Sequence, residues 1–176
     1  KDSDPYIHMP VGFFKMTSGP LIWGYETAPL RHANNRRAVY PQARVLGGGS
    51  SINAEIYTRG CPEDYDNWAT QHGCDGWSWR DLQPCFIRSE GNARLGGADH
   101  GIDGPLAVSD LQSPNRLSLA YVQGCMDIGM PHNPDFNGGR QRGVGCLQLT
   151  IDAGCRCSAV DAFLRPVLHD PRLTLR

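Results

Sequence analysis

Residues 43–54 contain the positions with the clearest capacity for chemistry. Three consecutive glycines there are followed by Ser50 and Ser51. Because glycine has no Cβ, a flat or charged ligand can approach the main chain closely at this point. We predict a short strand or an extended entry over 43–46, a glycine turn, and a helix over 52–57 capped by one of the two serines. The unpaired N–H groups at the start of such a helix suit a phosphate, or an anion spread over a heteroaromatic ring.

The glycine run by itself does not define a site. The sequence does, however, exclude two known kinds of site, the P-loop and the nucleophile elbow. A tight turn between a strand and a helix uses the same residues, and this is the commoner reason for a bare glycine run. No Lys-Ser or Lys-Thr pair follows the glycines, as a P-loop requires. The sequence also has no G-x-S-x-G elbow that would present a nucleophilic serine.

The seven cysteines and six histidines do not predict a metal site. Neither a C-x-x-C nor an H-E-x-x-H pattern occurs, and the close pair Cys155 and Cys157 has no second pair near it. Structural zinc sites need paired ligands at regular spacing. The odd cysteine count argues against a closed set of disulfides and favours free thiols in a reducing compartment.

The composition is that of an ordinary globular protein. The 176 residues include 17 Lys+Arg and 18 Asp+Glu, and a formal net charge of −1 excludes a polybasic nucleic-acid binder. The sequence contains no uncharged apolar run of the roughly 18 residues that a membrane span needs, and no signal peptide opens it. It begins at Lys1 and ends in residues 172–176, which alternate like the start of a strand. We therefore expect a soluble, internal piece of a longer protein.

Caps and periodicity predict the elements around the glycine turn. The first 42 residues lack periodicity and carry many prolines and glycines, so we expect an irregular stretch that lies over other elements. Helices are predicted over 62–70, over 78–89 with a kink at Pro84, over 117–128, and from Ser158 to Pro166. Strands are predicted over 106–108 and 144–151.

The neighbours of the glycine run make it informative. Residues 43–53 (ARVLGGGSSIN), 57–60 (YTRG), 62–66 (PEDYD) and Trp68 resemble the first signature of the glucose-methanol-choline (GMC) oxidoreductases. Further matches follow in the family's order over essentially the whole chain: WGYET at 23–27, NNRR at 34–37, GWSW at 76–79, HG at 100–101, DGPL at 103–106, DFNG at 135–138, GVG at 143–145, RCSA at 156–159, LRP at 164–166 and LT at 173–174. The bacterial choline and aliphatic alcohol dehydrogenase branch fits best, and residues 106–111 (LAVSDL) resemble the alkanol enzymes more than the choline enzymes.

The resemblance implies an α/β fold that combines two partial domains. These are part of a FAD/NAD(P)-binding Rossmann-like domain with covering helices, and part of an antiparallel-sheet substrate domain. Residues 1–100 are then the remainder of the FAD domain with the flavin-binding loop and covering helices, 101–155 the start of the substrate domain, and 156–176 the return toward the FAD domain. The family's G-x-G-x-x-G fingerprint and the acid that holds the adenosine ribose are absent from the sequence. The second signature and the late catalytic histidine with its His or Asn partner are absent too, so we assign no catalytic residue and expect this chain alone to be inactive.

The resemblance also implies that the parent protein is an FAD-dependent alcohol or choline dehydrogenase. In the family, a histidine takes the alcohol proton and the carbon-bound hydride passes to flavin N5. A quinone or another carrier, or oxygen in the oxidases, then accepts the electrons. A helix that begins near Ser51 would stabilise negative charge developing on the flavin. The cofactor-binding positions carried over by the match are Val45, Gly48, Ser51, Asn53, Ala54, Glu55 and Ile56.

Two positions in this segment depart from the family pattern. Ile52 stands where some members attach FAD through a histidine, so we expect the FAD to be non-covalent. Glu55 stands where methionine or a small residue is common, a change that is tolerable if the contact there is through the main chain.

Two alternatives to the dehydrogenase remain open. Some family members are hydroxynitrile lyases, which keep the fold without the redox step, and a non-catalytic GMC-like remnant or interaction domain is the second alternative. The partners implied by the resemblance are a small alcohol substrate and a quinone or other electron carrier, with no nucleic acid. The implied location is cytoplasmic, with association at the inner membrane through a quinone partner as a further option.

Several other side chains are interpreted as structural. His100, in the His-Gly turn, has a family counterpart and is assigned to structure. The aromatic residues expected to pack as core, rather than to line a substrate channel, are Tyr65, Trp68, Trp77, Trp79 and Phe86. The arginines expected to pair with carboxylates such as Asp64, rather than with pyrophosphate, are Arg36, Arg37 and Arg59.

Overall fold

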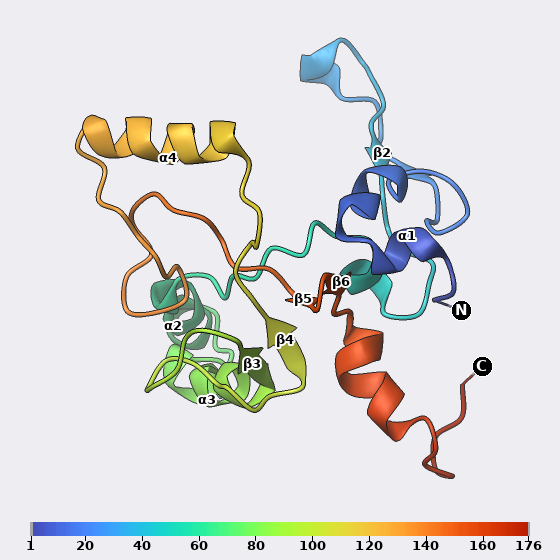
Figure 1. Ribbon diagram of the computed structural model, residues 1–176. Helices are drawn as coiled ribbons and strands as arrows, with labels where there is room; N and C mark the ends of the chain where they lie inside the picture. The colour runs from blue at the N-terminus through green and yellow to red at the C-terminus, as the bar shows by residue number, and fades with distance from the viewer. Residues whose placement is uncertain (1, 176) are drawn as a thin grey trace. The chain divides into compact units, whose positions relative to one another are not determined.

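The structure, a computed structural model, describes residues 2–175 and has a mixed α/β composition (Figure 1). It divides into two compact units. Unit 1 contains the residues up to Glu55 and those from Ile151 onward, and unit 2 is Ile56–Thr150. Within the described residues, no helix is both long and apolar enough to cross a membrane.

Unit 1 consists of short elements joined by long irregular segments. Its elements are α1 (Pro5–His8), a 3₁₀ helix Pro10–Lys15, the antiparallel pair β1 (Tyr25–Glu26) and β2 (Val39–Tyr40) with a 3₁₀ turn Arg31–Ala33 between them, a 3₁₀ turn Gly48–Ser51, the antiparallel pair β5 (Ile151–Asp152) and β6 (Cys155–Arg156), a π-helix Val160–Leu164 and a 3₁₀ turn Arg165–Val167. Its buried apolar side chains include Ile7, Met16 and Val160. The predicted irregular character of the first 42 residues is confirmed.

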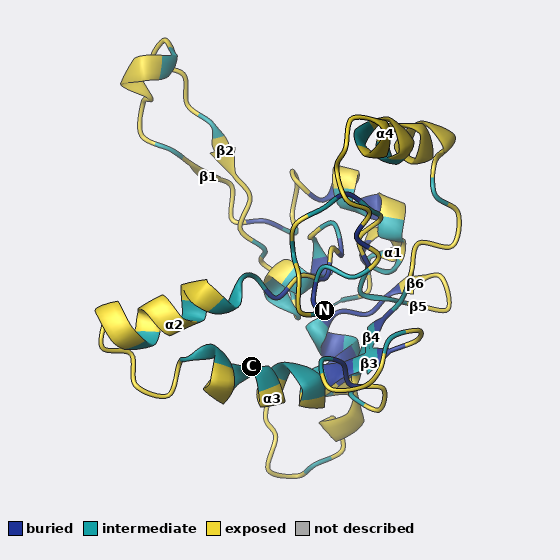
Figure 2. Ribbon diagram, turned by 90° about the vertical axis from the view of Figure 1, so that its left-hand side faces the viewer, coloured by how far each residue is buried: buried dark blue, intermediate teal, exposed yellow. Residues whose placement is uncertain are grey.

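Unit 2 contains the longer helices. Its elements are α2 (Pro62–Gln71), α3 (Trp79–Ser89), the parallel pair β3 (Glu90–Asn92) and β4 (Leu106–Val108), and α4 (Arg116–Asp127). Leu149 forms isolated bridges with Ile56 and with Ser109, which bring the end of this unit beside its beginning. Figure 2 shows that α2 and α4 are mostly exposed, whereas every residue of the β3–β4 pair is buried or half-buried.

Local signals account for the helices of unit 2. Pro62 occupies the first turn of α2, and Glu63 and Asp64 place negative charge at the positive end of its dipole. In α3, Ser78 and Asp81 form a capping box, and the helix continues through Pro84. The helices predicted over 62–70, 78–89 and 117–128 and the strand over 106–108 are therefore confirmed.

The helix predicted from Ser158 to Pro166 forms as the π-helix Val160–Leu164 followed by the 3₁₀ turn Arg165–Val167. Two other predicted elements differ from the structure. Residues 52–57 do not form the predicted helix, because the 3₁₀ turn ends at Ser51, the chain turns again at Ile52 and Asn53, and Glu55 adopts a left-handed φ of 57°. The predicted strand over 144–151 is reduced to isolated bridges at Val144 and Leu149 before β5 begins. In both segments, long-range contacts replace the regular backbone hydrogen bonds.

The aromatic side chains of α2 and α3 pack on one another, but the prediction that all five form core is wrong for Trp68 and Trp77, which are 43% and 53% exposed. The Tyr65 ring lies 5.1 Å from the Trp68 ring and 5.8 Å from the Phe86 ring between centroids, both edge-on. Trp79 lies 5.7 Å from Tyr65. Edge-on aromatic contacts at these distances add favourable energy beyond area burial, so the cluster holds the two helices together.

We predict opposite effects for two glycine-to-alanine substitutions in unit 2. A Cβ at Gly101 would overlap the carbonyl oxygens of Ile87 and Glu90, so Gly101→Ala should lower the free energy of unfolding by about 2 kcal/mol or more. Gly124, inside α4, has open space at its Cβ, and Gly124→Ala should raise it by about 0.5–1 kcal/mol. Urea unfolding measures both variants, and equal effects would contradict the close packing at Gly101.

Candidate functional site

Residues 45–55, which we call the glycine loop, fold around a buried serine. Gly47 and Gly48 adopt left-handed φ values of 86° and 55°. The Ser51 hydroxyl, fully buried, donates to the Leu46 carbonyl oxygen at 2.7 Å. A Cβ at Gly47 would overlap the Ser51 oxygen, so this position needs glycine for both its conformation and its lack of a side chain.

The outer side of the glycine loop is open. An added Cβ at Gly48 or Gly49 would meet no atom within 4 Å. Gly49 also lines a cavity of about 250 Å³ together with Ile52, Asn53 and residues from 17 and 41–43. Within the described residues, the Ala54 N–H donates to no acceptor of the protein. These features fit a flat cofactor that lies against the main chain and accepts a hydrogen bond from it.

The predicted cofactor-binding residues occupy different positions around this opening. Val45 is half-buried and its carbonyl oxygen accepts from the Gly48 N–H at 3.0 Å. Asn53 is exposed and lines the cavity, whereas Glu55 is buried and points its carboxylate to Arg156. Ile56 is the first residue of unit 2. The structure thus brings six of the seven residues together in unit 1.

The helix expected to stabilise charge on the flavin is absent. The four residues Gly48–Ser51 form a 3₁₀ turn, so no α-helix begins at Ser51 and the argument from a helix dipole is wrong. What the loop offers a ligand is individual N–H groups and the amide of Asn53. Short-range propensity favoured a helix here, but the contacts of Asn53 and Glu55 to Arg156 hold the chain in another conformation.

Arg156 is the site residue that sequence reasoning did not single out. Its guanidinium is completely buried and lies 2.5 Å from the Glu55 carboxylate. Burial raises the pKa of Glu55, and the positive charge of Arg156 counteracts part of that rise. The sequence carried no spacing signal for this contact, since Arg156 lies 103 positions from Asn53, to which it also donates.

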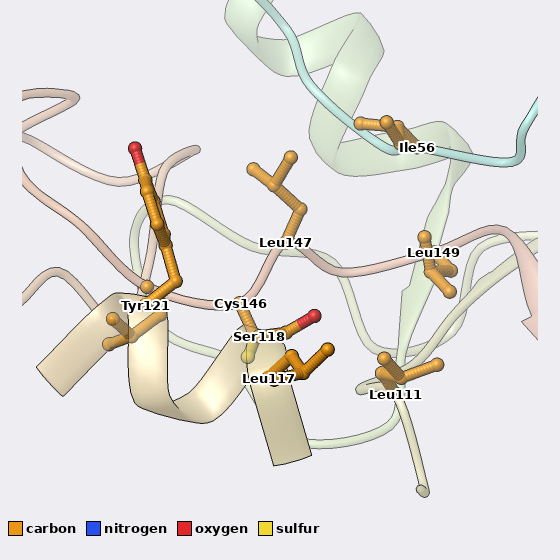
Figure 3. A pocket seen from close by; sticks show the side chains of 10 residues that line it. Ile56, Leu111, Leu117, Ser118, Tyr121, Cys146, Leu147 and Leu149 are labelled. Atoms are coloured by element: carbon orange, nitrogen blue, oxygen red, sulfur yellow. The ribbon is translucent and has the colours of Figure 1, made fainter. Parts of the chain in front are cut away.

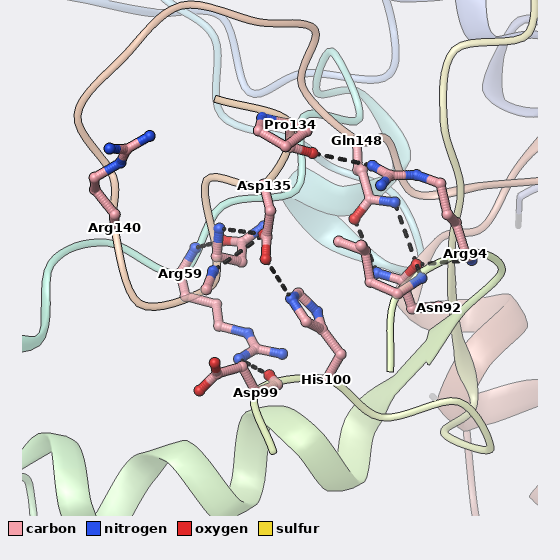
Figure 4. Close-up of polar contacts among 12 residues, drawn as sticks. Arg59, Asn92, Arg94, Asp99, His100, Pro134, Asp135, Arg140 and Gln148 are labelled. Carbon is pink, nitrogen blue, oxygen red and sulfur yellow. Dashed lines mark hydrogen bonds and ion pairs between the residues drawn. The ribbon is translucent and has the colours of Figure 1, made fainter. Parts of the chain in front are cut away.

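Unit 2 contains a buried polar cluster centred on Glu90. Figure 4 shows other members of it, among them Arg59, Asn92, His100 and Asp135. The Glu90 carboxylate accepts from Arg59 Nη2 at 2.5 Å and from Asn92 Nδ2 at 2.9 Å. His100 Nδ1 lies 3.1 Å from Glu90 Oε1, and His100 Nε2 lies 3.0 Å from Asp135 Oδ2. Each ring nitrogen of His100 therefore faces a carboxylate oxygen, and Arg59 brings a positive charge to the same cluster.

The buried cluster has the residue types of an acid–base site but is closed to substrate. Glu90 is fully buried and His100 is 5% exposed. Its geometry supports the structural assignment of His100. Arg59 pairs with a carboxylate as expected, but the partner is Glu90 rather than Asp64, and Arg59 also donates to the Asp99 carbonyl oxygen at 2.6 Å.

A second cavity in unit 2 is apolar and has a volume of about 500 Å³ (Figure 3). Residues of α4 form one wall, and residues 145–149 form another. The side chains around it include Ile56, Leu111, Leu117, Tyr121 and Leu149. Because the lining contains no charged residue, the cavity suits an aliphatic group rather than a phosphate or a carboxylate.

Among residues 2–175, no group of three or more His, Cys, Asp and Glu side chains is arranged to hold a metal ion.

Residues 14–175 match the family model described as GMC oxidoreductase. The chain is 43% identical over 177 residues to an alcohol dehydrogenase [acceptor] from Pseudomonas putida, and 40% identical over 177 residues to an oxygen-dependent choline dehydrogenase from Sinorhizobium fredii. Each comparison covers 99% of this chain but 32% of the relative. The chain therefore spans about a third of the length of these relatives.

Solved structures resemble the fold over nearly the whole chain. Pyridoxine 4-oxidase from Mesorbium loti superposes with a TM-score of 0.90 at 28% identity, over 97% of this chain and 34% of that protein. An FAD-dependent oxidoreductase from Chaetomium thermophilum superposes with a TM-score of 0.81 at 30% identity, over 94% and 30% of the two chains.

The buried cluster predicts a specific loss of stability in acid. Burial tends to raise the pKa of Asp135, but hydrogen bonds from the Asn137 N–H, the His100 ring and the Gly138 N–H outweigh it and lower the pKa. A carboxylate with a lowered pKa in the folded state stabilises the protein above its unfolded pKa of about 3.9, and this contribution is lost as the pH falls through the folded value.

We therefore expect Asp135→Asn to be less stable than the wild type near neutral pH, and to lose less stability than the wild type on acidification. Urea midpoints measured from about pH 6 down to about pH 3 check this difference. Asp103→Asn, at an exposed position of the same unit, makes the same charge change and should follow the wild-type profile. Parallel profiles for all three proteins would show that Asp135 is not coupled to folding.

Proposed function

Because this chain belongs to the GMC oxidoreductase family, we propose that it is the flavin-loop part of an FAD-dependent oxidoreductase that acts on CH–OH donors. The complete protein then oxidises a primary aliphatic alcohol or choline. The observation that carries this proposal is the open glycine loop, in which an added Cβ at Gly48 or Gly49 meets no atom within 4 Å and Gly49 and Asn53 line a cavity. The alcohol and choline dehydrogenases among the relatives support the same chemistry.

The residues of the glycine loop would hold the flavin non-covalently. Bound FAD supplies the acceptor for the hydride that leaves the alcohol carbon. Gly48 and Gly49 allow the ring system to approach the backbone, and the Ala54 N–H and the Asn53 amide provide donors toward it. Donors held in place in this way stabilise negative charge on a flavin without reorganising during the reaction. The assignment of Val45, Ser51, Glu55 and Ile56 as cofactor-binding positions belongs to the same proposal.

We propose the domain assignment that the family resemblance implies. We assign residues 1–100 to the FAD domain with its flavin-binding loop and covering helices, 101–155 to the start of the substrate domain, and 156–176 to the return toward the FAD domain. The Rossmann-like first strand and the catalytic histidine belong to other parts of the complete protein. This chain would therefore orient the flavin without itself moving the substrate proton.

The substrate side of the proposal uses the apolar cavity of about 500 Å³ in unit 2, whose uncharged lining favours the aliphatic chain of an alkanol over choline. A quaternary ammonium group is usually held by aromatic rings, whereas this lining is mostly aliphatic with one tyrosine. We infer a quinone or another carrier as electron acceptor, in the cytoplasm or peripherally at the inner membrane. The similarity to an alcohol dehydrogenase [acceptor] supports a carrier of this kind.

The decisive experiment follows the flavin absorbance of the complete protein under anaerobic conditions. We expect the protein to purify with FAD, and a long-chain primary alkanol to bleach the flavin faster than choline does. A flavin that stays oxidised with every alcohol would overturn the dehydrogenase and favour a hydroxynitrile lyase. A protein that binds no flavin would support the non-catalytic remnant.

A substitution in the glycine loop tests the close approach of the cofactor. Because a Cβ at Gly49 meets no protein atom and φ is not left-handed there, Gly49→Ala should change the free energy of unfolding by less than about 0.5 kcal/mol. The same methyl group should weaken FAD binding about tenfold if the ring lies against the backbone. Titration of the apoprotein with FAD measures this effect.

The matched control is Gly139→Ala in unit 2, where the Cβ also has open space. It should leave FAD affinity unchanged. FAD affinity that is equal in the Gly49 variant and the wild type would show that the cofactor does not contact this part of the loop.

A further inference from the structure

The side chain of Arg156 joins several parts of unit 1 at one buried point. Its Nε donates to the Ile7 carbonyl oxygen at 2.7 Å. Its Nη1 donates to the Ser50 carbonyl oxygen at 3.1 Å and to Asn53 Oδ1 at 2.7 Å. Its Nη2 forms an ion pair with Glu55 Oε1 at 2.5 Å. Three of these four contacts are therefore made to the glycine loop.

The glycine loop depends on contacts of this kind for its conformation. After the 3₁₀ turn ends at Ser51, the chain turns through Asn53 and reaches Glu55 at a left-handed φ of 57°. Such a conformation costs a non-glycine residue about 1 kcal/mol or more and persists only where surrounding contacts enforce it. Arg156 provides contacts before the turn, at Ser50, and after it, at Glu55.

The same contacts fix the orientation of the Asn53 amide. Asn53 Oδ1 accepts from Arg156 Nη1 at 2.7 Å and from the Glu55 N–H at 3.1 Å. With two donors facing this atom, it must be the oxygen, and the amide nitrogen is turned away from Arg156. Asn53 is exposed and lines the cavity of about 250 Å³. Its NH₂ group is thus the part of the side chain available to a ligand.

We propose that Arg156 is a positioning residue for the flavin: it holds Asn53 Oδ1 and the glycine loop so that the Asn53 NH₂ group and the Ala54 N–H face the bound ring. This inference rests on the proposed FAD function of the loop. Arg156 itself does not face the cavity, and it acts through the residues that do.

The planar guanidinium is suited to this role in a way that a lysine is not. Arg156 uses Nε, Nη1 and Nη2 in three directions at once. A lysine has one nitrogen and could satisfy only part of this arrangement. The neighbouring Glu55 carboxylate neutralises the buried charge, so the two side chains form one unit.

The test must separate loop positioning from folding. Replacing Arg156 alone leaves the Glu55 carboxylate buried without its partner, which by itself destabilises a protein strongly. The double variant Glu55→Met/Arg156→Met removes both charges and fills similar volume, and such replacements of a buried pair are often neutral for stability. It nevertheless removes the donor that holds Asn53.

We expect the double variant, in the complete protein, to unfold at a urea concentration close to that of the wild type. Its FAD affinity should fall about tenfold or more, because an anchored amide donor is lost. The visible absorption bands and the reduction potential of the remaining bound flavin should shift. In the apoprotein, the hydrogen-bonded amide hydrogens within residues 50–55, those of Ser50, Ile52, Asn53 and Glu55, should exchange at least about tenfold faster than in the wild type. The matched control, Asp170→Met/Arg172→Met, removes an exposed ion pair of the same unit and should change none of these properties.

Unchanged FAD affinity, spectrum and potential in a folded double variant would show that Arg156 has only a structural role. Hydrogen exchange decides the case in which the wild-type protein binds no FAD. Faster exchange at residues 50–55 would then support the hold of Arg156 on the loop while the proposed FAD function fails. Equal exchange in the variant and the wild type would overturn the inference itself.

Discussion

The buried ion pair between Arg156 and Glu55 is the interaction on which the glycine loop depends. A guanidinium removed from water must recover its lost hydration from partners in the protein. Arg156 recovers it from backbone and side-chain oxygens and from one carboxylate, and three of these acceptors belong to the loop. The requirement to satisfy one buried cation therefore also determines where the main chain of residues 50–55 lies.

Unit 2 uses the same physical solution around a buried anion. Glu90 receives donors from Arg59, Asn92 and the backbone of Gly101, and His100 connects it to Asp135. Removing either charge from such a cluster would leave its partner without compensation. Each unit thus has a charged centre supported by a small set of buried apolar side chains, and in each case the charged centre fixes loops that contain few regular backbone hydrogen bonds.

The two charged centres have different consequences for function. The Glu90 cluster is closed to solvent. It holds the segment that follows α3, through His100, against the turn at Asp135 and residues 137–138. The Arg156 centre lies behind a loop whose other side is open, so it supports an accessible surface without being part of it. A cofactor site needs this combination, because rigid support from behind keeps donors in place while the front remains free.

The sequence by itself determined those features that depend on neighbouring residues. The capping box of Ser78 and Asp81 begins α3, the glycine run marks the loop, and the ordered motifs identify the family. Only the tertiary structure decided the conformation of residues 52–57, where a helix was predicted. Asn53 and Glu55 are held there by contacts to an arginine about a hundred positions away, and a segment this short has only a weak preference of its own for helix. Partners so distant in sequence leave no spacing pattern, which is why Arg156 and the Glu90 partner of Arg59 emerged only from the fold.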